Sequence, residues 1–443
     1  MPISSFMGLQ TSLRGLIAHQ QAINTTGHNL SNSNTVGYSR QEAVLAAMPA
    51  LTIPANSATT GAGAQLGTGV DVLAIRRIRD SFLDIQYRAE SMQLGGASTK
   101  AQSLEQAELA FAEPSDNGIN ELLGRFWDAW SQLAQAPEAT SAARTNVVRM
   151  ASSLASAFQT VYAQLTTVAT QATDEYNKIT GPAGDVEVWA RELAQLNDTI
   201  SHAVAVGQSP NDLMDRRDFL IDRLSELAQV SVRDLGTGAL RVDFGGVTLV
   251  DPAAAGGYTW PQTLTSPGGK LGALQDLGSP TGPALTYRAR LDAVVGDFVT
   301  RVNAIHSAPT GVDFFDPVGT TADRIGVVAT AATIVTGSDG TSGRNDVANA
   351  IAQLRGGTVD RNYSALVAEV GSDVKSIRNS EKIQQALIDA IEDRRQSVQG
   401  VSPDEEMTNL IRFQRGYQAS ARTMTTLDDM LDTLINRTGK VGL

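Results

Sequence analysis

Residues 6–30 read FMGLQTSLRGLIAHQQAINTTGHNL, and large apolar side chains recur in them at alternating three- and four-residue intervals. The positions of this stripe are Phe6, Leu9, Leu13, Leu16, Ile23 and Leu30. Such spacing puts the side chains along one narrow face of an α-helix, as in the seam of a coiled coil. The sequence therefore predicts a helix over residues 3–31 whose apolar seam needs a partner.

The C-terminal end carries a matching stripe. Its positions are Leu410, Phe413, Tyr417, Met424, Leu427, Leu431 and Leu434. Ser402 and Pro403, followed by three acidic residues, are typical of a helix start, and Gly439 is a fitting end. Because a single amphipathic helix gains little stability in water, we expect the two terminal helices to pair as a coiled coil, with the rest of the chain inserted between them.

The chain between the terminal helices is expected to be largely helical. Helical patterns cover residues 77–94, 98–112, 118–134, 139–180, 185–205, 212–229, 283–306, 345–354 and 363–398. Alternating apolar residues predict strands in 230–250, whereas 251–283 read as loop and 309–343 as short strands and turns. The predicted fold class is mainly α with a smaller β portion, arranged as a discontinuous multi-domain rod.

This pattern suggests three domains, each made of separated segments. Residues 1–45 and 400–443 would form a terminal axial coiled-coil domain. Residues 46–230 and 284–399 would form a helical-bundle middle domain with short β-strands. Residues 231–283 and 307–345 would form a small β-rich and loop portion, with an outer domain reduced or absent.

Composition narrows the class of protein. The 443 residues carry 47 Asp and Glu against 35 Lys and Arg, without basic clusters, so we expect no nucleic-acid partner. Cysteine is absent, which excludes disulfides and thiolate chemistry. We expect no secretory signal peptide and, without a run of 18 apolar residues, no membrane insertion. Arg14 is the one charged residue among the first 39, which suits a helix packed on all sides by other protomers.

Few residues suggest chemistry. Asp212, Asp215 and Asp218 would share a helix face and could in principle hold a metal ion, but ion pairs with Arg216 and Arg217 on a solvated helix are the interpretation we favour. The histidines lack a second ligand at metal spacing; they are His19, His28, His202 and His306. The aromatic group Phe126, Trp127 and Trp130 suits a core rather than a ligand platform. We therefore expect no catalytic site, no metal and no cofactor.

The segment HNLSNSNTVGYSRQ, residues 28–41, is rich in residues that end helices and form turns. It resembles the signature of flagellar rod, hook and hook-associated proteins, with Asn32, Asn34, Gly37 and Tyr38 at its motif positions. Further resemblances follow in order along the chain, at residues 67–72, 211–220 and 400–418. The 211–220 segment, NDLMDRRDFL, is similar to one specific to the flagellar hook-associated protein 1 family.

This resemblance implies a structural protein, not an enzyme, that connects hook to filament in the extracellular flagellum after export by the flagellar type III system. It also implies self-assembly into a ring, contacts with hook protein and hook-associated protein 3, and an export chaperone at the C-terminal helix. The two apolar stripes, with Asn32, Asn34, Gly37 and Tyr38, are the expected assembly interface. We expect the chaperone to bind residues 410–434.

Two other classes fit part of the sequence. Another axial protein, such as hook-associated protein 3 or a flagellin-like protein, would share the terminal stripes but should lack the 211–220 segment and the 32–41 pattern in this form. A peptidoglycan hydrolase fused to axial ends would use Glu113 or Glu121 as its acid, and it would need two carboxylates that converge in a cleft.

Overall fold

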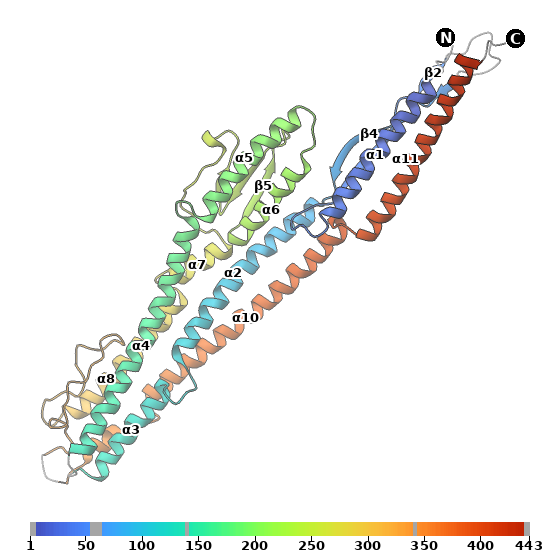
Figure 1. The fold of residues 1–443 in the computed structure, drawn as a ribbon. Coiled ribbons are helices and arrows are strands. Elements are labelled where there is room, and N and C mark those ends of the chain that lie inside the picture. The colour runs from blue at the N-terminus through green and yellow to red at the C-terminus, as the bar shows by residue number, and fades with distance from the viewer. Residues whose placement is uncertain (1–5, 54–63, 138–140, 340–342, 438–443) are drawn as a thin grey trace.

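The structure, a computed structural model, describes residues 6–53, 64–137, 141–339 and 343–437. The molecule is long and mostly helical, and the start of the first helix lies beside the end of the last one at one tip (Figure 1). The fold class expected from the sequence, mainly α with a few short strands, is confirmed.

Eleven α-helices lie within the described ranges. They are α1 (Met7–Ser31), α2 (Ser81–Phe111), α3 (Ile119–Gln135), α4 (Ser141–Thr180), α5 (Asp185–Ala205), α6 (Asn211–Leu227), α7 (Gly269–Gly278), α8 (Pro283–His306), α9 (Asp346–Ala352), α10 (Thr358–Gln399) and α11 (Pro403–Asp432). A 3₁₀ turn, η1 (Ala255–Gly257), and a π-helical turn, η2 (Thr433–Arg437), complete the helical elements.

The strands form three small antiparallel sheets. They are β1 (Gln41–Ala47) with β4 (Val70–Arg77), β2 (Leu51–Ile53) with β3 (Ala64–Leu66), and β5 (Val230–Asp234) with β6 (Leu240–Phe244) and β7 (Val247–Val250). In the first sheet the register shifts between Val44 and Leu45, where a bulge bends the ribbon.

Helices α1 and α11 lie side by side and run in opposite directions, away from the rest of the molecule (Figure 1). The start of α11 is the one expected from the sequence, because the Ser402 hydroxyl accepts a hydrogen bond from the Glu405 amide and Pro403 follows it. Pairing of the terminal helices agrees with the expectation, whereas coiled-coil geometry stays a prediction. Gly439, the expected helix end, lies outside the described residues.

The β1–β4 ribbon packs on α1. The Arg14 guanidinium donates to the Thr68 carbonyl at 3.0 Å, and Gly69 packs against Thr11. We expected residues from 46 onward to belong to the helical bundle. In the structure both strands of the ribbon lie against α1, so the ribbon lies with the terminal helices.

Helices α2 and α10 form the long antiparallel pair that continues from the terminal helices (Figure 1). The helical patterns expected over 77–94 and 98–112 form one helix, and α2 passes through Gly95 and Gly96 between them. A Cβ at Gly95 would clash with the Glu226 carbonyl of α6, and one at Gly96 would lie 3.1 Å from the Gly269 carbonyl of α7. These glycines therefore permit a close approach of backbones and do not end the helix.

The far end of the molecule holds the larger hydrophobic core, built from α2, α3, α4, α8, α9 and α10. Its centre is a group of fully buried rings: Phe126, Trp127, Trp130, Phe298, Phe314 and Phe315. The expected core role of Phe126, Trp127 and Trp130 is thus confirmed.

The expectation of short strands in residues 309–343 is wrong. Within the described part of that segment there is a single isolated bridge, Phe315 with Val327. The Asn303 side chain accepts hydrogen bonds from the Phe314 and Phe315 amides at 3.0 and 2.9 Å, so it takes donors that a strand ladder would use.

A second core joins α5, α6, α7 and the β5–β7 sheet to the end of α4. The predicted strands in 230–250 are confirmed there. Helix α7 lies in the stretch expected to be loop, and it buries Leu271, Leu274 and Leu277 at three-residue spacing. Segments 231–283 and 307–345 were expected to form one portion, yet they contribute to different cores.

Candidate functional site

The face of α1 that contacts α11 consists mostly of small residues. We call this the contact face: Gly8, Ser12, Gly15, His19, Ala22, Thr26 and Asn29. A Cβ on Gly15 would lie 3.0 Å from the Ser420 hydroxyl, and one on Gly8 would lie 3.2 Å from Leu427. Gly416 of α11 faces the His19 ring in the same way. Small side chains let the two helix backbones approach each other closely.

The predicted stripes occupy different places on the two helices. On α11, Leu410, Phe413, Tyr417, Met424, Leu427 and Leu431 are half-buried towards α1, while Leu434 is 60% exposed. On α1, Leu9, Leu16, Ile23 and Leu30 are half-buried, and Phe6 and Leu13 are exposed.

Five of the seven members of the contact face precede a position of the α1 stripe by one residue, which is a rotation of about 100°. The other two, His19 and Thr26, precede Gln20 and Gly27. The leucines of α1 therefore lie beside the helix contact and keep part of their surface uncovered. This offset was not expected from the sequence, because apolar spacing identifies a stripe but not which stripe meets the partner.

The loop after α1 is tied to both terminal helices through Asn29. The Tyr38 hydroxyl donates to Asn29 Oδ1 at 2.7 Å, and the Gln41 amide donates to the same oxygen at 2.9 Å. Asn29 Nδ2 donates to Glu406 Oε2 of α11 at 3.1 Å, and the Arg40 guanidinium donates to Glu406 Oε1 at 2.7 Å. Burial together with Asp212, Asp215 and Glu406 raises the pKa of Tyr38, so its hydroxyl keeps the proton that it donates.

The motif residues of this loop have distinct roles. Asn32 Nδ2 donates to the His28 carbonyl and ends α1, whereas Asn34 is exposed. Gly37 has φ 82°, and a Cβ there would lie 3.1 Å from the Phe219 ring of α6. Both the left-handed backbone and the close ring favour glycine.

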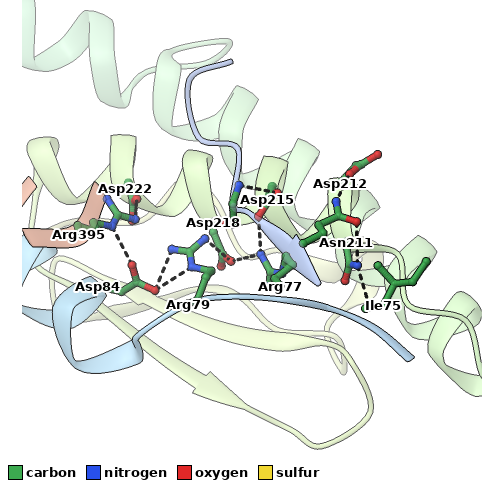
Figure 2. Close-up of polar contacts among 12 residues, drawn as sticks. Ile75, Arg77, Arg79, Asp84, Asn211, Asp212, Asp215, Asp218, Asp222 and Arg395 are labelled. Carbon is green, nitrogen blue, oxygen red and sulfur yellow. Dashed lines mark hydrogen bonds and ion pairs between the residues drawn. The ribbon is translucent and has the colours of Figure 1, made fainter. Parts of the chain in front are cut away.

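A row of ion pairs joins the base of the terminal helices to α2, α6 and α10 (Figure 2). We call it the ion-pair row: Arg77, Arg79, Arg88 and Arg395 with Asp84, Asp215, Asp218 and Asp222. Arg77 lies 2.9 Å from Asp215 and 2.8 Å from Asp218. Four cations and four anions balance, and all eight side chains are at least four-fifths buried.

The row continues without a gap to α10. Arg79 lies 2.8 Å from both Asp218 and Asp84, and Arg395 lies 2.9 Å from Asp84 and 2.6 Å from Asp222 (Figure 2). Removing one member would leave its partners as buried charges without compensation, which typically costs about 3–5 kcal/mol. The row therefore fixes how the terminal helices meet the body.

The electrostatics keep these groups ionised. Burial alone would raise the pKa of the Asp218 carboxyl, but Arg79 and Arg77 outweigh it and hold this pKa below the ordinary 3.8. Burial alone would lower the pKa of Arg79, but Asp218 and Asp84 raise it above its usual value.

The favoured interpretation of the 211–220 segment, solvated pairs along one helix, is therefore wrong for Asp215 and Asp218. They pair with arginines of another element. Arg217 is also buried, and it donates to the Gly238 carbonyl at 2.6 Å. The sequence did contain a signal for these ion pairs. Asp215, Asp218 and Asp222 share one helix face without a basic residue on it, so burial of that face requires basic side chains from another element.

The other motif residues of α6 bind the ribbon. Asn211 Nδ2 donates to the Ile75 carbonyl at 2.9 Å (Figure 2), and Gln41 Nε2 donates to Asp212 at 2.8 Å. Across the described ranges no group of three His, Cys, Asp or Glu could hold a metal ion.

The carboxylates proposed for a hydrolase have other partners. Glu113 accepts from the Asn120 amide at 2.9 Å at the start of α3 and from the Tyr363 hydroxyl at 3.2 Å, while Glu121 pairs with Arg125 at 3.1 Å on the surface. His306 Nδ1 lies 2.8 Å from the Val312 carbonyl, and its Nε2 accepts from the Val335 amide at 3.0 Å. These contacts hold loops and helix ends in place.

Both ends of the chain match families of flagellar rod and hook proteins. Residues 9–38 match the family described as flagella basal body rod protein, and residues 395–437 match flagellar basal body rod FlgEFG protein C-terminal. These ranges contain α1 with its loop, and α11, so the terminal helices define an axial protein of the flagellum.

The middle of the chain identifies the family. Residues 104–263 match the flagellar hook-associated protein FlgK helical domain. Flagellar hook-associated protein 1 of Bacillus subtilis is 31% identical over 509 residues, covering 99% of both chains, and that of Salmonella typhimurium is 26% identical, covering 96% of this chain and 98% of its own. The chain belongs to the flagellar hook-associated protein 1 family, and it has a structural role in the flagellum.

One solved structure, the flagellar hook junction protein FlgK from Burkholderia pseudomallei, matches 52% of this chain and 46% of its own, with 23% identity and a TM-score of 0.44. Among the residues that the structure covers, no helix is long and apolar enough to cross a membrane.

Proposed function

We propose that this protein is the junction between hook and filament, supports filament assembly, and reaches its extracellular position through the flagellar type III export system. The observation that carries the proposal is the arrangement of the terminal helices: α1 and α11 pair at one tip, away from the two hydrophobic cores, and still leave apolar side chains partly uncovered.

The assembly interface that we propose consists of the two stripes and the motif loop. Leu13 and Ile17 are 41% and 44% exposed on α1, beside the half-buried Leu9, Leu16 and Ile23. Burying apolar surface contributes roughly 25 cal/mol per Å². A lateral contact that covers this side of α1 would therefore stabilise an assembly. Arg14 is the one Lys, Arg, Asp or Glu of α1, and it already donates to the Thr68 carbonyl, so few charges would have to be buried.

The partners follow from this arrangement. Copies of the chain would form a ring through their terminal helices, with hook protein on one side and hook-associated protein 3 on the other. The acidic body would face solvent. Neither nucleic acid nor a membrane is a partner in this proposal, and no enzymatic step is involved.

The export chaperone would bind the α11 stripe before α1 pairs with it. The half-buried leucines of α11 would be fully exposed in a chain that has not yet folded, which gives the chaperone an apolar helix face to cover. A chain without residues 401–443 should lose chaperone binding in a pull-down, and undiminished binding would contradict this site.

The whole proposal is tested by deleting the gene in its motile bacterium. The expected result is loss of motility, with intact hooks and with flagellin released into the medium. Normal filaments on the mutant cells would refute the junction role.

A further inference from the structure

A large cleft opens in the body of the molecule. The α2–α10 pair lines one side of it, and the end of α4 with the start of α5 lines the other (Figure 1). We call it the body cleft; its volume is about 1100 Å³, and its lining comes from residues 87–102, 174–179, 183–189, 223–227, 270 and 385–392. Among the described residues, none of α1 or α11 lines it, so its occupant would not touch the proposed assembly interface.

Part of the lining is apolar and lies outside the hydrophobic cores. Leu94 of α2 is half-buried and lines the cleft, and it packs in none of the cores of the described chain. Ile388 of α10 lines the cleft beside it and is likewise outside the cores. The Trp189 ring of α5, half-buried at the edge of the second core, adds aromatic surface. Leu94 therefore gives the cleft apolar surface that the packing of the chain does not use.

Acidic side chains outnumber basic ones around the cleft. Three basic residues line it, against six acidic ones: Asp174, Glu175, Asp185, Glu226, Asp389 and Glu392. Two of the basic residues already pair within the lining, since Lys270 lies 2.6 Å from Glu175 and Arg223 lies 3.3 Å from Glu226. Six to three exceeds the ratio of the whole chain, 47 to 35. Because a concave surface with low-dielectric walls concentrates the field of its charges, the cleft attracts cations.

The elements around the cleft indicate what kind of partner fits. Apart from the turn at 183–184, every residue of the lining belongs to a helix. The lining thus offers no strand edge to which an extended peptide could add, whereas a helix can lie in a groove between helices. Two turns of a helix about 11 Å in diameter fill roughly 1000 Å³, which the cleft can hold. The close contact of Gly95 with the Glu226 carbonyl joins α2 to α6 in the lining, so the cleft is formed before a partner arrives.

We propose that the body cleft is a docking site for a basic amphipathic helix of a second protein. The apolar face of that helix would lie on Leu94 and Trp189. Its lysines or arginines would reach Asp174 on one side of the cleft and Asp389 on the other, both of which are exposed. Such a partner covers the apolar surface and balances the excess of carboxylates at once, whereas an acidic or purely polar helix does neither.

The test uses the full chain and a fluorescent model peptide, built from leucine and lysine at helical spacing, whose binding is followed by anisotropy. Physiological salt screens diffuse attraction between exposed charges. Asp174→Lys combined with Asp389→Lys should weaken binding about tenfold or more, because like charges then face each other. The matched control, Asp198→Lys combined with Asp393→Lys, makes the same change in net charge at exposed positions outside the cleft and should leave binding unchanged.

A second pair of variants tests the apolar contact. Leu94→Gln should weaken binding of the peptide about tenfold or more, with little change in melting temperature, because Leu94 packs in neither of the two large cores. Leu109→Gln alters a leucine of the same helix that is 76% exposed and lies outside the cleft, so it should not affect binding. Equal binding of a peptide with the same residues in scrambled order would overturn helix docking and leave only attraction to an acidic surface.

Other occupants of the cleft would give different results. If the chain alone associates with itself and Leu94→Gln abolishes that association, the occupant is a second copy and the proposal of a different protein is overturned. Wild-type affinity in both the Leu94→Gln and the Asp174→Lys, Asp389→Lys variants would place the peptide elsewhere and would also overturn it. Neither result bears on the junction role, because these substitutions leave the proposed assembly interface intact.

Discussion

Replacing Gly416 by alanine is expected to loosen the contact between α1 and α11. A Cβ at this position would lie 2.6 Å from both Cε1 and Nε2 of the His19 ring and 2.9 Å from Cδ2. His19 Nδ1 is buried without a hydrogen-bond partner, so the ring is enclosed on its other side as well. Relief requires the ring to leave its position or the helices to separate.

Two opposing effects set the magnitude. Overpacking a close contact costs about 1–3 kcal/mol, while alanine in a helix is better than glycine by about 0.5–1 kcal/mol. Gly416→Ala should therefore destabilise the helix pair by about 1–2 kcal/mol. When His19 is also replaced by alanine the clash disappears, and the same substitution should stabilise by about 0.5–1 kcal/mol.

The assay is hydrogen exchange of the α1 and α11 amides in the full chain, which reports the free energy of local opening. The four proteins of the double-mutant cycle are wild type, Gly416→Ala, His19→Ala and the combination. Gly27→Ala is the matched control, because nothing lies within 4 Å of a Cβ at this helical glycine; it should increase protection. Equal loss of protection in both His19 backgrounds would refute the reasoning, because the effect would then not depend on the ring.

Three further predictions concern the loop, the ion-pair row and the far core. Gly37→Ala should destabilise its loop by about 2 kcal/mol. The effect should exceed that of Gly207→Ala, because Gly207 shares a positive φ but a Cβ there would have no neighbour within 4 Å. Limited proteolysis of each loop measures the difference, and an equal increase in cleavage for the two variants would exclude a role for the Phe219 ring. Asp218→Asn should lower the free energy of unfolding in urea by about 3 kcal/mol, whereas Asp198→Asn, at an exposed aspartate, should change it by almost nothing. The folded state lowers the pKa of Asp218, so the stabilisation from this carboxylate is present above pH 3.8 and is lost as the pH falls through the folded pKa. Burial lowers the pKa of His306 below 6.5, so the folded state binds a proton at this ring less readily than the unfolded state does. The stability of the protein should therefore fall as the pH drops below 6.5. His306→Gln should reduce the change in melting temperature between pH 7 and pH 5, and an unchanged pH dependence would contradict the role given to His306.

Much of the local structure was predictable because it depends on neighbours in the chain. Helices 185–205 and 283–306 have the bounds expected from apolar spacing, and the start of α11 follows from Ser402 and Pro403. Helix α7 was missed, since its glycine- and proline-rich surroundings read as loop and its three leucines become a helix face only when the second core covers them.

Contacts between distant segments set the rest. The sequence pattern assigned Gly95 and Gly96 no role, whereas in the structure they allow the close approach of α6 and α7. The acids of α6 read as solvated, and they became a buried row because Arg77, Arg79 and Arg395 arrive from elements more than a hundred residues away in sequence. Spacing along one helix cannot report what packs against it.

From the residues alone it followed that both ends are amphipathic helices, that the middle is mainly helical, and that the motif loop after α1 resembles those of flagellar axial proteins. That α1 meets α11 mostly through small residues, five of the seven contact positions lying one residue before a stripe position, became visible in the folded chain. The physical reason is that periodicity defines the apolar stripes of a helix, whereas which side meets a partner depends on how closely two backbones can approach, and this is a property of the pair.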